Sequence, residues 1–242
     1  MRATILQALT LLWVAAAAPA CAEVQLLQPW STSGGTLAPP WHLAGLPNQK
    51  KPFTRFSLVE LDGRRAMRIE ADESYGNLVH PLRIDGTALT LSWQWRVEQF
   101  VAESDLRTKN GDDTALKVCV FFDLPLEQIG IVERQIMRIA RAASHEPLPA
   151  ATVCYVWDRQ LSAGTMLDNA FTHRVRYLVL QTGEAKERRW VAERRDVGAD
   201  FLRLFGQESP QVPPIVGIAI GADADNTHGH SIAHVADLVL AP

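Results

Sequence analysis

The sequence predicts a mainly β protein, an antiparallel β-sandwich or jelly roll with one inserted amphipathic helix. At least eight segments have the character of strands, most with apolar and polar residues in alternation; this pattern places the two kinds of side chain on opposite faces of a sheet. Turn signals such as Asp-Gly and Asn-Gly separate the segments. Many strands with few helices are typical of sandwiches.

The first 22 residues are predicted to be a secretory signal peptide. Arg2 precedes a short apolar run, and small residues of the kind found at cleavage sites follow it. We expect cleavage after Ala22, which gives a periplasmic or secreted protein. A lipid anchor at Cys21 is the alternative, disfavoured because Ala18 occupies the position where a lipoprotein signal usually has Leu or Val.

Residues 23–242 are predicted to form a single sandwich domain, because the length suits one domain and no low-complexity linker divides it. The formal net charge is −3, whereas proteins that bind nucleic acids usually carry a basic surface. We therefore expect no nucleic-acid partner. We also expect no transmembrane span, since no second apolar run follows the predicted leader. The sequence leaves the oligomeric state open.

The segment LTLSWQWRV, residues 89–97, shows the alternation most clearly. Trp93 and Trp95 share a face with leucine and valine, so we interpret them as core residues rather than a sugar-stacking platform. Tyr155 and Trp157 share a face in the same way on a later strand.

Two segments, LKVCVFFD and TVCYVWD, are apolar on both faces and are therefore expected to be central strands. They contain Cys119 and Cys154. In an oxidising compartment these two cysteines either form a disulfide or remain as buried thiols. The sequence leaves both alternatives open.

A helix is predicted within residues 127–144. The apolar residues at helical spacing are Ile129, Val132, Ile136, Ile139 and Ala143. We expect this face to pack on the sandwich, while Arg134, Arg138 and Arg141 lie on the other side; a lid or a basic contact surface is the alternative. A shorter helix is expected in residues 199–206.

Several segments, in this order along the chain, are similar to the bacterial domain-of-unknown-function family 3047: LSWQWRV, KNGDD, KVCVFFD, CYVWD, RRDVGADFLRLFG, GIAIGADADNT and ADLVL. The paired tryptophans and the D-x-D-N-T segment are the most specific parts. The resemblance implies a sandwich similar to jelly-roll carbohydrate-binding modules. It implies no reaction, because the family has no established activity.

A metal site is one interpretation of the segment GADADNTHGH. Asp223, Asp225 and Asn226 offer the carboxylate and amide oxygens that calcium prefers, although the spacing is not that of an EF-hand. A turn stabilised by Asp and Asn side chains is the alternative. His228 and His230 with Asp225 would be a weaker zinc site.

A second polar segment, KNGDD, contributes Asp112 and Asp113. These two acids either cap or stabilise a turn, or converge with Asp223 and Asp225 at one rim of the sandwich. In the second case the counter-ions would be Arg96, Arg194 and Arg195. An ordinary surface pair between Arg195 and Asp196 is the alternative.

A polar sheet face opposite the tryptophans is the candidate ligand-binding surface. It would combine Gln94 and Arg96 of one strand with Asp123 and Asp158 of others. Together with Asp112, Asp113 and Arg195, these side chains could hydrogen-bond a glycan or another hydroxylated ligand.

Three functions are compatible with these patterns. The first is a secreted binding module for a carbohydrate or envelope glycan, and the second is a glycoside hydrolase or lyase that uses aspartate carboxylates. The third is an envelope interaction or assembly protein that docks through the predicted helix. We favour the binding module, because no nucleophile elbow, P-loop or zinc-protease motif appears in the sequence. A large exposed apolar patch would favour the third function.

Overall fold

The computed structural model describes residues 25–242 apart from 34–35 and 145–146. The predicted signal peptide, residues 1–22, and the alternative anchor at Cys21 lie outside these described residues. Within them, no helix combines the length and the apolar character needed to cross a membrane.

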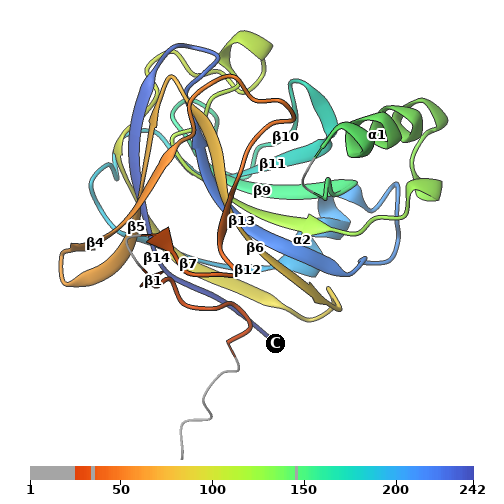
Figure 1. The fold of residues 1–242 in the computed structure, drawn as a ribbon, viewed down its shortest axis with the longest axis horizontal. Coiled ribbons are helices and arrows are strands. Elements are labelled where there is room, and N and C mark those ends of the chain that lie inside the picture. Colours follow the sequence, from red (N-terminus) through yellow and green to blue (C-terminus); the bar gives the residue numbers. More distant parts are fainter. Residues whose placement is uncertain (1–24, 34–35, 145–146) are drawn as a thin grey trace, which may run out of the picture.

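Two β-sheets pack face to face and confirm the predicted sandwich (Figure 1). The larger sheet has seven strands in the order β10-β11-β9-β8-β13-β6-β3, and the smaller sheet has five in the order β12-β7-β14-β5-β4. Neighbouring strands are antiparallel except β9 and β11, which run parallel.

The elements have the following bounds. The early strands are β1 (Thr32–Ser33), β2 (Thr36–Leu37), β3 (His42–Ala44), β4 (Arg55–Leu61), β5 (Arg64–Asp72), β6 (Tyr75–Ile84) and β7 (Thr90–Gln99). The later strands are β8 (Lys117–Phe122), β9 (Ala151–Asp158), β10 (Met166–Asn169), β11 (Thr172–Thr182), β12 (Val191–Asp196), β13 (Ile215–Asp223) and β14 (His230–Ala241). The helices are α1 (Ile131–Ala143) and α2 (Val197–Phe205), with short 3-10 turns at Lys109–Gly111 and Leu126–Gln128.

Aromatic side chains fill the space between the two sheets. Trp93 of β7 packs 5.3 Å from Tyr155 of β9, and Trp95 packs 5.9 Å from Trp157, measured between ring centroids. All four side chains are buried, which confirms their interpretation as core residues. Strands β7 and β9 therefore pack against each other across the sandwich through their aromatic faces.

The two cysteines form a disulfide. Cys119 of β8 lies directly opposite Cys154 of β9 in the antiparallel register, so the two thiols project to the same side of the larger sheet. This side faces away from the smaller sheet and carries a second apolar cluster. That cluster includes Leu106 from the loop between β7 and β8, which covers this part of the sheet.

Helix α1 forms where the sequence predicts it, but the prediction that its apolar face is buried was wrong. Val132, Ile136 and Ile139 of the predicted face are 74%, 60% and 71% exposed, and Ile131 beside them is 75% exposed. Ile129 is buried, but it lies before the first residue of the helix. The helix is held instead by Met137, which is buried in the core, and by its polar side chains. Arg134 Nε donates to the Leu126 carbonyl at 2.8 Å, and Glu133 forms an ion pair with Arg174 at 3.0 Å.

Helix α2 covers one end of the core. The Asp196 carboxylate accepts a hydrogen bond from the Ala199 amide at 2.9 Å and so caps the first turn. Phe201 and Phe205 are buried, and Gly206 follows the last helical residue, as the sequence predicted.

Candidate functional site

A polar cluster lies on the outer face of the larger sheet, the face turned away from the smaller sheet. Alternation along β8 directs Val118 and Val120 into the core between the sheets. It directs Lys117 and Cys119 to the outer face. Asp223 ends the neighbouring strand β13, so its carboxylate lies next to Lys117.

Lys117 and Asp223 form a buried ion pair. Their Nζ and Oδ2 atoms are 2.7 Å apart, and the two side chains are only 7% and 5% exposed. The Thr114 amide and hydroxyl donate to the other carboxylate oxygen at 2.8 and 2.9 Å. Burial alone would lower the pKa of Lys117, but the Asp223 carboxylate raises it above its ordinary value. Lys117 therefore carries its positive charge at neutral pH.

Asp112 lies beside this pair in a less favourable environment. Burial, together with the nearby Asp223 carboxylate, raises the pKa of Asp112 to about 6. The Tyr177 hydroxyl donates to Asp112 Oδ1 at 3.1 Å, and the Asn169 amide donates to Oδ2. Asp112 thus gains or loses its proton close to neutral pH, whereas a free aspartate does not.

Asp113 holds the turn after β13. Its carboxylate accepts from the Asn226 and Thr227 amides at 3.2 and 2.7 Å and from the Thr227 hydroxyl at 2.6 Å. The structure therefore brings together the two acidic segments at one rim, which is one of the two alternatives that the sequence left open. The side chains of Asp113 and Asn226 form hydrogen bonds that hold the turn, as in the alternative of a turn stabilised by side chains.

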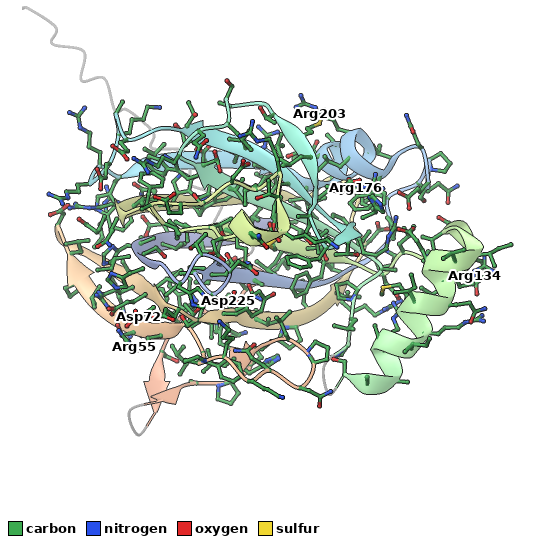
Figure 2. The ribbon with its side chains drawn as sticks, turned by 90° about the horizontal axis from the view of Figure 1, so that it is seen from above. Arg55, Asp72, Arg134, Arg176, Arg203 and Asp225 are labelled. Atoms are coloured by element: carbon green, nitrogen blue, oxygen red, sulfur yellow. A yellow bond between two sulfur atoms is a disulfide. The ribbon has the colours of Figure 1, made fainter. Side chains whose placement is uncertain are left out.

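Asp225 is the least satisfied acid of the group. Its Oδ1 is buried and has no hydrogen-bond partner among the described residues. Burial, the Asp223 carboxylate and the Asp113 carboxylate all raise the pKa of Asp225. Figure 2 shows Asp225 on the side of the molecule that also carries Arg55 and Asp72, away from Arg134 of α1.

The predicted calcium ligands do not form a shared oxygen cluster. Both oxygens of Asp223 accept from Lys117 and Thr114, and the Asn226 amide nitrogen donates to the Asp112 carbonyl at 3.1 Å. Across residues 25–242 with their two gaps, no three His, Cys, Asp or Glu side chains are arranged to hold a metal ion. Calcium binding by Asp223, Asp225 and Asn226 therefore stays a prediction, and the positions of their oxygen atoms do not favour it.

The histidines of the zinc alternative are held apart. His228 Nδ1 lies 3.0 Å from Glu73, and His230 Nε2 lies 3.2 Å from Glu70. Each imidazole therefore faces a different carboxylate, and neither contacts Asp225 in the hydrogen bonds of the described chain.

The open side of the cluster consists of residues that the sequence analysis missed. Tyr75, Asn77 and Asn169 are each partly exposed. The Tyr75 ring lies 4.9 Å from the Lys117 ammonium, and Asn77 donates to the Tyr75 hydroxyl at 3.2 Å. Gly221 makes room for Asn77, since a Cβ there would collide with the Asn77 amide oxygen. Tyr75 and Asn77 are two residues apart at the start of β6, a spacing that places both on one face of the sheet.

The predicted single polar face opposite the tryptophans does not exist, because its residues belong to different sheets. Gln94 and Arg96 lie on the outer face of the smaller sheet, where Gln94 donates to Asp237 at 2.7 Å and Arg96 pairs with Asp62 at 2.5 Å. Asp158 lies at the end of β9 in the larger sheet. Its carboxylate accepts from the Gln160 amide at 2.7 Å and so stabilises a turn.

Arg195 is also separate from the acidic rim. It forms a two-pronged ion pair with Asp200 of α2, at 2.8 and 2.6 Å. The same carboxylate accepts from the Tyr155 hydroxyl at 3.0 Å. Arg195 therefore ties β12 to α2 and pairs neither with Asp112 and Asp113 nor with Asp196.

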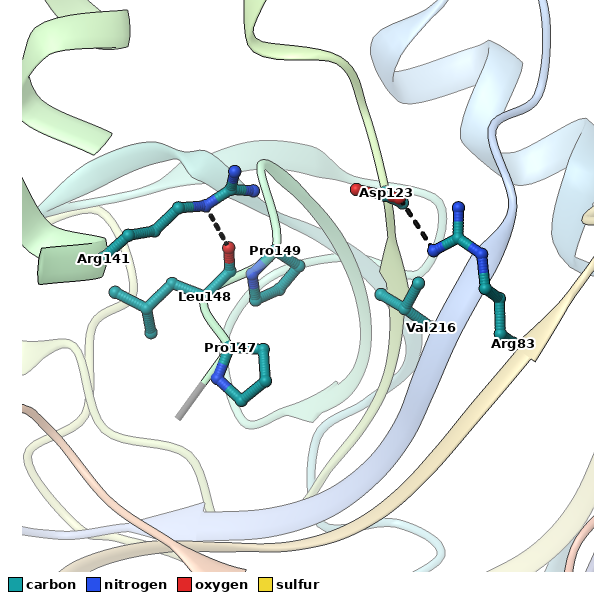
Figure 3. A pocket seen from close by; sticks show the side chains of 7 residues that line it. All are labelled: Arg83, Asp123, Arg141, Pro147, Leu148, Pro149 and Val216. Carbon is teal, nitrogen blue, oxygen red and sulfur yellow. Dashed lines mark hydrogen bonds and ion pairs between the residues drawn. The ribbon is translucent and has the colours of Figure 1, made fainter. Parts of the chain in front are cut away.

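A hollow of about 360 Å³ lies beside α1, and none of its lining residues belongs to the polar cluster (Figure 3). It is lined by Arg83, Asp123, Arg141, Pro147, Leu148, Pro149 and Val216. Its carboxylate, Asp123, pairs with Arg83 at 2.9 Å, and Arg141 donates to the Leu148 carbonyl at 2.9 Å. Asp123 is the one carboxylate among the described residues that line the hollow, whereas a hydrolase of the predicted kind would need two close carboxylates.

The family model described as a protein of unknown function, DUF3047, matches residues 39–239. The chain belongs to the DUF3047 family. The matched range runs from the segment before β3 into β14, so it contains every residue of the polar cluster in this DUF3047 protein. No curated protein matches the sequence significantly.

Several solved structures match this chain at very low sequence identity and with TM-scores below 0.5. The catalytic domain of Humicola grisea Cel12A has 10% identity and a TM-score of 0.42, over 89% of this chain and 96% of that one. A family 12 xyloglucanase from Bacillus licheniformis has 6% identity and a TM-score of 0.40, over 82% and 99%. A family 11 xylanase from Neocallimastix patriciarum has 10% identity and a TM-score of 0.38, over 88% and 94%.

Proposed function

We propose that this DUF3047 protein is a periplasmic or secreted binding module for a carbohydrate or envelope glycan. The ligand would contact Tyr75, Asn77 and Asn169 on the outer face of the larger sheet. The observation that carries the proposal is that these three side chains are partly exposed and border the buried ion pair of Lys117 and Asp223. The predicted signal peptide supports the location.

The chemistry of these side chains suits a hydroxylated ligand. Amides and phenols both donate and accept hydrogen bonds, as sugar hydroxyls do. The network below fixes them, because Asn169 contacts Asp112 and donates to the Tyr177 hydroxyl at 2.9 Å, while Tyr75 covers Lys117. Polar groups that are already held in place lose little freedom when a ligand binds.

A glycan-binding panel tests the proposal. The panel should contain cello-oligosaccharides, xylan, soluble peptidoglycan fragments and acidic polysaccharides. We expect at least one class to bind, and we expect Asn77→Ala and Tyr75→Phe each to weaken that binding about tenfold through the loss of a hydrogen bond. Gln94→Ala on the smaller sheet is the matched control and should bind as the wild type does. Binding that depends on Gln94 and ignores Asn77 would move the site to the other sheet.

A second candidate function is glycan cleavage by hydrolysis or elimination. The pKa of Asp112 near 6 favours it, because a carboxyl group that titrates near neutral pH suits proton transfer. Incubation of the panel with the protein, followed by a reducing-end assay, tests this candidate. Release of sugar that Asp112→Asn abolishes would establish an enzyme. Binding without release would leave the binding module.

Calcium binding at Asp223, Asp225 and Asn226 remains an expectation from the sequence. Thermal unfolding after EDTA treatment, with calcium then added back, tests it. A stabilisation by calcium that Asp225→Ala abolishes would establish a metal site, and unfolding temperatures that calcium does not change would remove it.

A further inference from the structure

Helix α1 presents an unusual concentration of exposed apolar side chains. Of the ten large hydrophobic residues that the described chain leaves exposed, four lie on this helix: Ile131, Val132, Ile136 and Ile139. At about 100° per residue these four side chains occupy an arc of about 140° around the helix axis. Met137, on another side of the helix, is the buried residue that contacts the core.

Three arginines border this apolar arc. Arg134, Arg138 and Arg141 form no ion pair with a carboxylate among the described residues. In the part of the chain that the structure describes, Arg134 and Arg141 donate to backbone carbonyls and not to carboxylates. The acid within the helix, Glu133, is paired with Arg174 of β11. The helix is therefore a cationic and apolar surface on a chain whose formal net charge is −3.

We propose that α1 docks this protein on an anionic lipid surface. An amphipathic helix with exposed aliphatic residues and bordering arginines lies flat in a membrane interface, with its apolar side among the acyl chains and its cations at the headgroups. Figure 1 and Figure 2 show α1 at one end of the molecule, where the sandwich does not cover it. The surface shares no residue with the proposed glycan face.

The charge pattern favours lipid over a second copy of the chain. A symmetric dimer through this face would place one α1 against the other, because a two-fold interface uses the same patch on both subunits. That arrangement would bring two sets of unpaired arginines together. An anionic headgroup layer instead supplies the opposite charge along the whole edge of the helix.

Vesicle sedimentation and hydrogen exchange test the proposal. The full-length protein is mixed with vesicles of phosphatidylcholine and phosphatidylglycerol, or with phosphatidylcholine alone. We expect binding to the anionic vesicles, slower amide exchange in residues 131–143, and weaker binding as the salt concentration rises.

Two variants and one control locate the contact. Ile136→Glu combined with Ile139→Glu should lower binding at least roughly tenfold, and Arg138→Gln should lower it about fivefold. The control is Leu43→Glu on β3, where the side chain is 49% exposed, and it should bind as the wild type does. All variants share the same N-terminal residues, so a difference between them reports on α1.

The proposal fails if exchange in residues 131–143 is unchanged by anionic vesicles or if the α1 variants bind as tightly as the control. It also fails if sedimentation velocity shows a dimer that the isoleucine substitutions dissociate, because a second copy would then cover the face. Thermal unfolding of each variant confirms that the exposed substitutions leave the fold intact.

Discussion

The outer faces of the two sheets carry similar residues in very different environments. On the smaller sheet, Arg96 pairs with Asp62, whose side chain is 56% exposed. On the larger sheet, the side chains of Lys117 and Asp223 are almost completely buried, where Thr114 donates to Asp223 and the Tyr75 ring lies over Lys117. The comparison teaches that an aspartate paired with a basic residue is partly exposed to solvent in one place and a buried structural requirement in the other.

Removal of the Asp223 carboxylate is the strongest way to test this difference. Asp223→Ala leaves the Lys117 ammonium buried without its partner, so we expect a loss of about 3–5 kcal/mol in the free energy of unfolding. Asp62→Ala, the matched change on the smaller sheet, should cost less than about 1 kcal/mol. Urea unfolding of both variants measures the contrast, and equal losses would contradict the assigned burial.

The disulfide between Cys119 and Cys154 stabilises the outer face of the larger sheet. Replacing Cys119 and Cys154 together with Ala should lower the free energy of unfolding by about 2–4 kcal/mol, because the bond closes a loop with a sequence separation of 35 residues. A reducing agent should destabilise the wild type in urea unfolding and leave the double variant unchanged. A wild type that ignores the reductant would argue against the bond.

The pH dependence of stability tests the environment of Asp112. Its pKa is about 6 in the fold against an ordinary value of 3.8, so the folded state binds the proton more tightly. The free energy of unfolding should therefore fall by at most about 3 kcal/mol as the pH rises from about 4 to about 6, and stay lowered above that range.

The variant Asp112→Asn isolates this effect. It should flatten the profile between pH 4 and pH 6 and be more stable than the wild type at neutral pH. The pKa of Glu70 is lowered to about 2, so its contribution is lost below its ordinary value of 4.5 as the pH falls, mostly outside this window. Identical slopes in wild type and variant, measured by urea unfolding at several pH values, would show that Asp112 is not perturbed.

The strand pattern made most of the fold predictable. Alternation in LTLSWQWRV assigned Trp93 and Trp95 to the core, and both are buried. The same rule cannot say which strands share a sheet, because period-two alternation carries no information on long-range pairing. This is why Gln94 and Arg96 were grouped with Asp158, although β7 and β9 lie in different sheets.

Helix α1 and the polar cluster show two further limits. The helical spacing of apolar residues correctly predicted α1. Spacing alone, however, cannot distinguish an apolar face that is buried in the core from one that is exposed at the surface. In the cluster, the proximity of Asp112 and Asp113 to the segment after β13 was one of two alternatives that the sequence left open. Tyr75 and Asn77 gave no signal, because a tyrosine and an asparagine at the start of a strand are ordinary turn and strand residues.

The most direct test of the proposed glycan face uses the three tyrosines of the chain. Two of them, Tyr75 and Tyr177, belong to the polar cluster, whereas Tyr155 lies in the core between the sheets. In protein labelled with ¹³C-tyrosine, the ring signals are followed by NMR during titration with each glycan of the panel. We predict that a binding glycan shifts the signals of Tyr75 and Tyr177 and leaves Tyr155 unchanged. Binding that leaves Tyr75 and Tyr177 unchanged, or a panel without any binder, would contradict the proposed site.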